Sequence, residues 1–298
     1  MAQIQNELAE RELIKEFRHS NTWIGSVTSK NNWVGNDVIK IPRRGIAPNV
    51  LINNNIYPIV RNDREDDFIV LSLNKYDTEN TTISDDELYA LPYEKINDVQ
   101  VQHREQLEDK TQAHFLYSIA PAANAAKTPV LATTGADDGT GRKRLTTTDL
   151  ITFRTKLLSK PLLVPKKGIM LILCAQHIED LLLADLTFQN SYQNIKDGLI
   201  SKNYCGFETY EDTNEVTYKD VGGTLTKEAF DGVPTGKTAS IVAHRSNLVK
   251  AVGSVKRYST LAENDPDNRE TKLGFRLWAG CFATKDEGMG AIVSGTVS

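Results

Sequence analysis

The sequence predicts an α+β fold, because its helix-forming and strand-forming segments lie in different parts of the chain. Residues 93–118 contain no glycine or proline and carry apolar side chains at helical spacing, which predicts one long helix. Residues 145–185 have a helix–strand–helix pattern around IMLILCA (169–175), a segment that is apolar on both faces. Residues 204–282 are rich in strand-forming segments separated by long turns.

The composition limits the classes of protein that this chain can belong to. With 298 residues, of which 40% are hydrophobic and 25% charged, a packed globular protein of two lobes is expected. The net charge of -4 argues against a protein that coats nucleic acid, which needs a strong basic excess, although weak local contact stays open. No apolar run reaches the roughly 20 residues of a membrane span, and the first residues lack the apolar core of a secretion signal. Cys174, Cys205 and Cys281 lie far apart, which favours reduced thiols in a protein made in a cytosol.

The first part of the chain is predicted to form an arm followed by a projection. Residues 1–31 combine a short amphipathic helix with polar, turn-rich sequence and carry too little apolar surface to fold alone. WVGNDVIKIP (33–42) and DFIVLSL (67–73) are predicted strands, and the connection between them is far longer than an ordinary hairpin loop. Two such strands are only marginally stable by themselves. We therefore expect the projection to rest on another part of an assembly.

Aromatic and arginine side chains gather around this projection. The predicted inter-subunit contact residues are Trp33, Arg43, Arg44, Tyr57, Arg61, Arg64 and Phe68. This combination is enriched in protein–protein interfaces, although the same side chains can also stack nucleic-acid bases. The neighbouring acids Glu65, Asp66 and Asp67 would repel phosphates, so we favour a protein partner.

Two helix starts are recognisable in this part of the sequence. SDDE (84–87) has the spacing of a capping box, and Pro92 suits the first position of a second helix, which is the long one. A helix over 93–118 would be roughly 39 Å long, which is typical of a structural girder. His103 and His114 lie on its apolar face and are interpreted as structural histidines.

A loose connection and a second helix are predicted to follow. The Gly-, Ala- and Thr-rich residues 120–144, which include GADDGTGRK (135–143), are interpreted as a flexible linker at a lobe boundary. Thr146 or Thr147 is the predicted cap of the amphipathic helix that comes next.

DGVPTGKTAS (231–240) resembles a phosphate-binding loop but lacks its first glycine. Asp231 stands in that position, where a carboxylate would repel phosphates. The sequence after it, TASIVAH (238–244), is a predicted strand, whereas a phosphate loop must lead into a helix. We therefore interpret this segment as a solvent-exposed turn.

The sequence offers no catalytic constellation. The five histidines lack metal-binding spacing, and there is no G-x-S-x-G motif. Cys174 ends a buried strand and is expected to be inert, because apolar burial raises the pKa of a thiol. We therefore expect no catalytic residue, no metal ligand and no cofactor.

The order of these parts resembles the Hong Kong 97-type major capsid protein of tailed bacteriophages. The legs of that family's extended loop resemble WVGNDVIKIP and YPIVRNDREDDFIVLSLNKYDT, and the start of its spine helix resembles ISDDELYALPYEKINDVQVQH. Its axial domain is similar to LLVPKKGIMLILCAQHIEDLLLADLTF followed by GFETYED. Its closing strands resemble VKRYSTLAENDPDNRETKLGFRLWAGCFATKDEGMGAIVSG. The resemblance implies an N-terminal arm (1–31), an extended loop (32–77), a peripheral domain with the spine helix (78–144), an axial domain (145–250), return strands of the peripheral domain (251–284) and a C-terminal axial strand (285–298).

The resemblance also implies a function. Copies of the chain would form hexamers and pentamers of an icosahedral head that encloses double-stranded DNA, assembled in the cytoplasm of a bacterial host and located in the virion. A portal protein, decoration proteins and non-specific contact with the packaged DNA are the implied partners. Only some 31 residues precede the extended loop, which is too short for a fused scaffolding segment unless one is already cleaved, so a separate scaffolding protein is expected.

Besides the short N-terminal segment, one further departure from the family's plan and two alternatives belong to this interpretation. Residues 211–238 form a longer polar excursion than the family's plan requires, which predicts that DGVPTGKTAS is a surface or inter-subunit turn. An encapsulin-like nanocompartment shell would enclose enzymes instead of DNA. A nucleotide-binding enzyme that uses residues 231–238 is the alternative from a different class.

Overall fold

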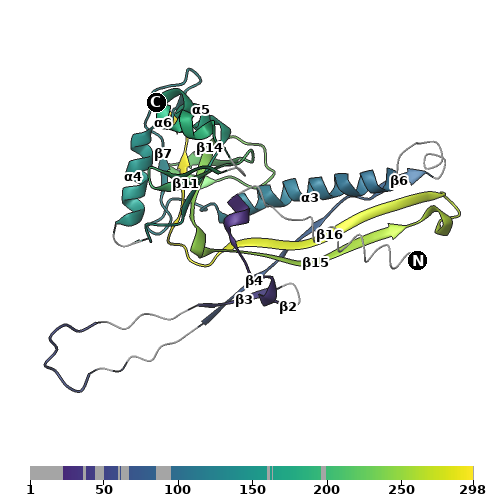
Figure 1. The fold of residues 1–298 in the computed structure, drawn as a ribbon, viewed down its shortest axis with the longest axis horizontal. Helices are drawn as coiled ribbons and strands as arrows, with labels where there is room; N and C mark the ends of the chain where they lie inside the picture. Colours follow the sequence, from purple (N-terminus) through teal and green to yellow (C-terminus); the bar gives the residue numbers. More distant parts are fainter. Residues whose placement is uncertain are drawn as a thin grey trace.

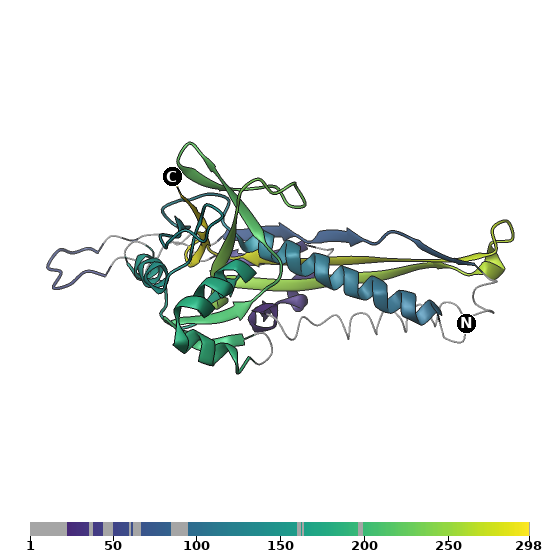
Figure 2. The same ribbon diagram turned by 90° about the horizontal axis from the view of Figure 1, so that it is seen from above.

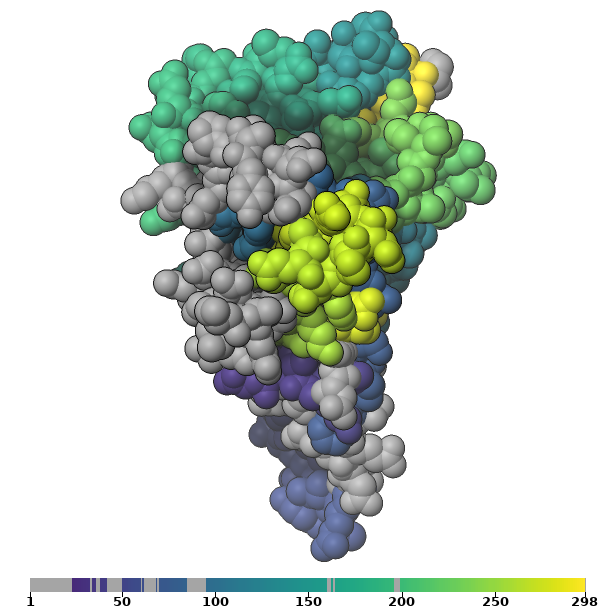
Figure 3. Space-filling view, turned by 90° about the vertical axis from the view of Figure 1, so that its right-hand side faces the viewer, coloured from purple at the N-terminus to yellow at the C-terminus, as the bar shows by residue number. Residues whose placement is uncertain are grey.

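The computed structural model describes residues 23–35, 38–43, 50–59, 61, 67–84, 95–159, 162, 164–195 and 199–297. Figure 1 shows two lobes and a projection. The compact lobe holds an eight-stranded sheet with its helices, and the elongated lobe holds a long helix beside a five-stranded sheet. The projection points away from both lobes and narrows toward its far end (Figure 3). The predicted α+β class is confirmed.

The compact lobe is built around β9 (Ile169–Leu173), all of whose residues are buried. β9 pairs in parallel with β11 on one side and antiparallel with β14 on the other. The other strands of this sheet are β7 (Val130–Ala132), β10 (Leu199–Tyr204), β11 (Phe207–Glu211), β12 (Val216–Val221), β13 (Thr224–Lys227), β14 (Lys237–His244) and β17 (Met289–Val293). The expectation that IMLILCA is a strand buried on both faces is confirmed.

The two faces of β9 lie in different cores, because successive side chains of a strand point to opposite sides. Leu171 and Leu173 pack in a core with side chains of three helices, α4 (Thr147–Leu158), α5 (Ala175–Ala184) and α6 (Leu186–Tyr192). Met170 and Ile172 face the larger core, which the compact lobe shares with the elongated lobe. The central strand therefore joins both halves of the fold.

The second helix of the prediction begins with a capping box. The Thr146 side chain accepts the backbone N–H of Asp149 at 3.2 Å, and the Asp149 carboxylate accepts the backbone N–H of Thr146 at 3.0 Å. Both donors are groups that a helix start would otherwise leave without partners. Of the two predicted caps, Thr146 is the one that forms.

The elongated lobe is a long antiparallel ribbon with a helix beside it (Figures 1 and 2). Its two long strands, β15 (Leu248–Thr260) and β16 (Glu270–Ala283), pair from Leu248↔Ala283 to Thr260↔Lys272. The outer edge of β16 carries β5 (Asn74–Asp77) and β6 (Thr81–Ser84), and β1 (Thr28–Ser29) runs parallel to β15.

The spine helix, α3 (Lys95–Ile119), lies within two residues of its predicted bounds. The buried face carries Val99, His103, Leu107, Thr111, Phe115, Leu116 and Ile119, so two polar residues lie within the predicted apolar stripe. Residues 85–94, which contain most of the predicted capping box and Pro92, lie outside the described residues. Ser84, the predicted cap, ends strand β6.

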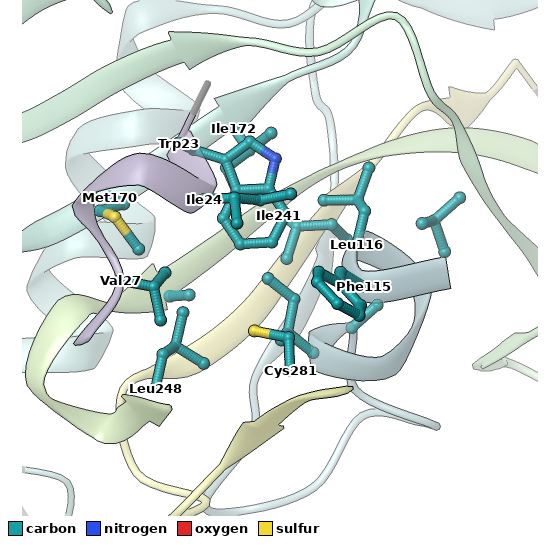
Figure 4. Close-up of a cluster of buried hydrophobic side chains, with 14 of the residues drawn as sticks. Trp23, Ile24, Val27, Phe115, Leu116, Met170, Ile172, Ile241, Leu248 and Cys281 are labelled. Atoms are coloured by element: carbon teal, nitrogen blue, oxygen red, sulfur yellow. The ribbon is translucent and has the colours of Figure 1, made fainter. Parts of the chain in front are cut away.

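The last part of the predicted arm is anchored in the larger core (Figure 4). The short helix η1 (Trp23–Ser26) places Trp23 and Ile24 fully inside this core, and Val27 follows them. Trp23 Nε1 donates to Asp212 Oδ2 at 2.6 Å, and Lys250 Nζ donates to the carbonyl oxygen of Ile24 at 2.6 Å. Residues 1–22 of the predicted arm lie outside the described residues.

The prediction of a flexible linker over residues 120–144 is wrong. β7 pairs with β17 in the eight-stranded sheet, and β8 (Arg142–Lys143) pairs with β18 (Gly295–Thr296). Arg142 is buried and donates to both carboxylate oxygens of Asp180 on α5, at 2.7 and 2.8 Å. This ion pair spans 38 positions, so the short-range composition that indicated a linker carried no sign of it.

Candidate interaction surface on the projection

Two strands form the legs of the projection and fasten it to the elongated lobe. β3 (Val38–Arg43) pairs antiparallel with β4 (Asp67–Ser72), from Val38↔Ser72 to Arg43↔Asp67. Ile39 and Ile41 are buried against Val249 and Ala251 of β15. Alternate residues of a strand point to opposite faces, so one face of the two legs packs on the elongated lobe and the other face points outward.

The outward face of β4 carries two exposed apolar side chains. Phe68 and Val70 stand two residues apart on this face, and 62% and 58% of their surfaces are exposed. The exposed Ser72 follows them on the same face, and the exposed Lys40 of β3 pairs with Val70. Antiparallel sheets usually place polar residues on the face that meets water, so Phe68 and Val70 are the unusual residues of this face.

The far end of the projection is an uncharged, apolar segment, residues 50–59. Its large apolar side chains are each at least 55% exposed: Val50, Leu51, Ile52, Ile56, Tyr57 and Ile59. The bend between them is held locally, because the Asn54 side chain accepts the N–H of Ile56 at 3.1 Å and donates to its carbonyl oxygen at 2.9 Å. The structure thus holds a run of apolar side chains away from the rest of the chain. We call residues 50–59 the apolar tip.

The predicted contact residues are only partly placed by the structure. Tyr57 lies in the apolar tip, Phe68 lies on the outward face of β4, and Arg61 is exposed. The backbones of Trp33 and Arg43 belong to η2 (Asn31–Trp33) and to β3, and their side chains are not described.

Arg44 and Arg64 lie outside the described residues, so their predicted role stays untested. The structure adds residues that the sequence reasoning missed, namely Val50, Leu51, Ile52, Ile56, Ile59 and Val70. Their signal is VLINNNIYPI itself, an uncharged stretch in a connection that should have been polar.

The segment 231–240 does not form a phosphate-binding loop. It leads into strand β14, which confirms the predicted strand and leaves no helix N-terminus for a phosphate. The Glu228 carboxylate already accepts the backbone N–H groups of Thr235 and Gly236 and the Thr235 hydroxyl. These hydrogen bonds, that from the Thr235 side chain first, lower the pKa of Glu228 to about 2. The Glu228 carboxylate therefore occupies the backbone N–H groups that a bound phosphate would need.

A buried polar cluster surrounds Cys174 at the start of α5. Ser240 Oγ lies 2.6 Å from His177 Nδ1 and 3.6 Å from Cys174 Sγ, and Ser294 Oγ lies 3.0 Å from His177 Nε2. Burial raises the pKa of the Cys174 thiol, but the neighbouring His177 and the hydrogen bonds outweigh burial and leave this pKa below its usual value.

The expectation that Cys174 has an apolar environment is therefore wrong, because His177 and Ser240 reach it from α5 and β14. All four side chains of the cluster are buried, and their hydrogen bonds tie β14 and the segment after β17 to α5.

A groove of about 1000 Å³ lies between α3 and β5. Tyr76 Oη lies 2.7 Å from His114 Nδ1, and Thr81 Oγ1 lies 2.9 Å from His103 Nε2. Burial lowers the pKa of both histidines, and at His114 the positive charge of Lys227 lowers it further while Asp231 opposes this. Both histidines thus link the spine helix to the strands that lead out of the projection.

The described residues contain neither a metal-binding cluster nor a helix that could span a membrane. Their His, Cys, Asp and Glu side chains do not come together in any group of three or more that could hold a metal ion. Within the same residues, every helix is too short or too polar to cross a membrane.

Comparison with known proteins places the fold. No model of a protein family matches the chain, and no curated protein matches it. The solved capsid of cyanophage P-SCSP1u matches over 92% of this chain and 88% of its own, with a TM-score of 0.62 and 12% identity. The capsid of Ralstonia phage GP4 matches over 91% and 87%, with a TM-score of 0.61 and 10% identity. A virus-like particle from Pyrococcus furiosus matches over 97% and 99%, with a TM-score of 0.57 and 8% identity.

Each of these matches spans at least 87% of both chains, so the similarity covers most of the fold. At 8–12% identity the similarity concerns the fold. The chain has the phage capsid fold, as the sequence resemblance predicted.

Proposed function

We propose that this protein is a shell-forming subunit, the major capsid protein of a tailed double-stranded DNA bacteriophage. The capsid fold supports this assignment. The projection supports it as well, because its exposed apolar side chains need a second copy to cover them. In a shell, each copy would use its projection to contact a neighbour and would receive the projection of another copy.

The observation that carries the proposal is the exposed apolar tip. Burying one Val, Leu, Ile or Phe side chain contributes about 1.5–3 kcal/mol, and the tip holds six large apolar side chains in water. Monomeric soluble proteins rarely expose contiguous apolar surface on this scale. A second copy that covers the tip would recover this free energy.

Closed symmetry explains why the same surface appears in every copy. When each subunit both gives and receives one contact, identical subunits close into rings. We propose hexameric and pentameric rings, with Trp33, Arg43, Arg44, Tyr57, Arg61, Arg64 and Phe68 at the contacts together with the apolar tip. In this assignment residues 32–77 are the extended loop, and the compact lobe belongs to the axial domain.

The proposal includes partners and a location. A separate scaffolding protein, a portal protein and decoration proteins would complete the head, which would assemble in the host cytoplasm and become part of the virion. The mildly acidic chain would contact packaged DNA weakly, since strong binding needs a basic excess. The role of the subunit is structural rather than enzymatic.

Electron microscopy of the purified protein tests the proposal. Negative-stain images and velocity sedimentation of the recombinant chain should show rings or closed shells. Deleting residues 43–64 should leave a soluble subunit with no closed shells, because the tip and the ends of its legs are gone. Normal shells from the deletion variant would refute the role of the projection, and a wild-type chain that stays monomeric at high concentration would refute the proposal itself.

A shell that encloses proteins instead of DNA is the second candidate. One matched structure is described as a virus-like particle from Pyrococcus furiosus, and this match covers 97% of this chain and 99% of the other. The contents of particles purified from the producing cells separate the two candidates. Nuclease-protected DNA of uniform length supports the phage head, whereas one co-purifying protein in fixed proportion supports the compartment.

A further inference from the structure

Residues 212–236 add an edge hairpin, β12 and β13, to the eight-stranded sheet, followed by a turn that leads into β14. They correspond to the polar excursion of the sequence, which the capsid resemblance does not explain. Figure 2 shows this segment, in green, beside the C-terminal half of α3. Besides its pairing with β14, the segment contacts α3 and the residues directly after α3.

The hairpin places a lysine on the end of the spine helix. Gly222 and Gly223, with φ of 62° and 84°, form the two-residue loop between β12 and β13, a conformation that favours glycine. Lys227 at the end of β13 donates from Nζ to the carbonyl oxygens of Tyr117 and Ala120, both at 2.8 Å, and lies 3.9 Å from the centre of the Tyr117 ring. The last carbonyl groups of a helix lack partners within the helix and attract a cation, so Lys227 caps α3.

The same hairpin holds the chain that follows α3. The Lys227 backbone N–H donates to Ala122 at 2.8 Å, and Asn124 donates its N–H to Leu225 at 3.3 Å. On β12, the buried Tyr218 hydroxyl donates to the carbonyl oxygen of Pro121 at 2.6 Å. Residues 121–124 are therefore fastened by backbone pairing and by a buried side chain.

The turn after the hairpin grips the side of α3. The Phe230 ring lies 4.9 Å from the His114 ring in an edge-on arrangement and 5.4 Å from the Tyr117 ring, measured between ring centres. Asp231 accepts from Lys110 at 2.9 Å, although both side chains are more than half exposed and the ion pair is weak. The ring contacts of Phe230 with His114 and Tyr117 are thus the main contacts between the turn and α3.

The base of the segment is tied to the same helix. The buried Asp212 carboxylate accepts from Gln112 of α3 at 3.1 Å, from Trp23 at 2.6 Å and from the Asn214 backbone at 2.9 Å. The contacts on α3 therefore extend over its last three turns, from Lys110 to Ala120.

We propose that residues 212–236 act as a clasp that fixes the C-terminal half of the spine helix on the eight-stranded sheet and so sets the angle between the two lobes. A subunit with a fixed angle between its lobes gives shells of uniform curvature. This last step rests on the proposed function, whereas the clasp itself is a property of the single chain.

Hydrogen exchange of the isolated subunit tests the clasp. We expect the amides of residues 116–124 to exchange about tenfold faster in Lys227→Met and in Phe230→Ala than in the wild type, because local opening becomes easier. Lys219→Ala, an exposed position on β12, is the matched control and should leave exchange unchanged. Amides of β9 should keep their protection in every variant. If either variant loses that protection, the exchange of residues 116–124 is measured instead in Phe230→Leu, a smaller change, and compared with the wild type.

Exchange within about twofold of the wild type at residues 116–124, in folded Lys227→Met and Phe230→Ala alike, would overturn the clasp. Particle diameters test the consequence for shells. We expect a broader distribution of diameters from Lys227→Met and Phe230→Ala, and the wild-type distribution from Lys219→Ala. Equal diameters in the presence of faster exchange would overturn the link to curvature. A wild-type chain that forms no particles would refute the proposed function and leave the exchange result standing.

Discussion

Replacing Arg142 by methionine should strongly destabilise the subunit, because it leaves a buried carboxylate without its main partner. Asp180 is 1% exposed and accepts from two guanidinium nitrogens of Arg142 and from the Leu145 N–H at 2.8 Å. Removing one partner of a buried ion pair typically costs about 3–5 kcal/mol. Arg144 Nη1, at 3.6 Å from the same carboxylate, can recover part of this, so we expect a loss of about 3 kcal/mol for Arg142→Met.

The double variant Arg142→Met/Asp180→Leu is the matched comparison. Replacing both charges by apolar side chains removes the unpaired charge of Asp180 but leaves the Leu145 N–H without an acceptor, which costs about 1–3 kcal/mol. Asp138, which accepts from Arg142 Nε at 2.8 Å, loses this partner in the single and in the double variant alike. Urea unfolding of the isolated subunit, followed by circular dichroism, should therefore show the double variant to be more stable than Arg142→Met. A loss below about 1 kcal/mol for Arg142→Met, or a double variant as unstable as the sum of the two single variants, would refute the reasoning.

Three further predictions follow from the described contacts. Burial lowers the pKa of His103 and His114 below 6.5, so the folded chain binds fewer protons than the unfolded one, and the free energy of unfolding should fall as the pH drops below 6.5. The double variant His103→Gln/His114→Gln should flatten this slope in urea titrations at several pH values, and an unchanged slope would contradict the assignment. Lys237→Ala should leave particle formation and stability within about 0.5 kcal/mol of the wild type, because Lys237 starts a strand and holds no phosphate. Specific ATP binding by the wild type that is lost in Lys237→Ala would contradict this. Arg276→Ala should leave the midpoint of thermal unfolding essentially unchanged, since its ion pair with Asp77 is at the surface, and a clear drop of the midpoint would show that this contact organises β5.

The parts of the fold that follow from local pattern were predictable. The absence of glycine and proline, together with the spacing of Val99, Leu107 and Phe115, is enough to place α3 almost to the residue. β9 follows from an unbroken apolar run, and the α4 cap from a threonine three positions before an acid. Each of these signals lies within a few positions of the element that it predicts.

The parts that depend on distant partners were not predictable. Asp138 and Arg142 look like turn residues in a flexible stretch, and only Asp180, on a helix far along the chain, makes Arg142 a buried residue. The polar environment of Cys174 depends in the same way on Ser240, which is 66 positions away. A sequence pattern reports which side chains are available and does not report which of them meet.

The sequence predicted where the candidate surface lies but not which kind of side chain forms it. The length of the connection between β3 and β4 indicated a projection, and the search for arginine and aromatic residues found Tyr57 and Phe68. The aliphatic residues of the apolar tip were passed over, because exposed Val and Ile look like core residues until the structure shows nothing covering them among the described residues.

The most direct test of the account places one charge on the apolar tip. Ile52→Asp changes a side chain that is 84% exposed, and Val233→Asp, on the clasp turn at 87% exposure, is the matched control. Both variants should unfold at the wild-type urea concentration, since neither side chain is buried in the subunit. We expect sedimentation velocity to show particles from the wild type and from Val233→Asp but only free subunits from Ile52→Asp. Wild-type particle yields from Ile52→Asp would contradict the claim that a neighbouring copy covers the tip.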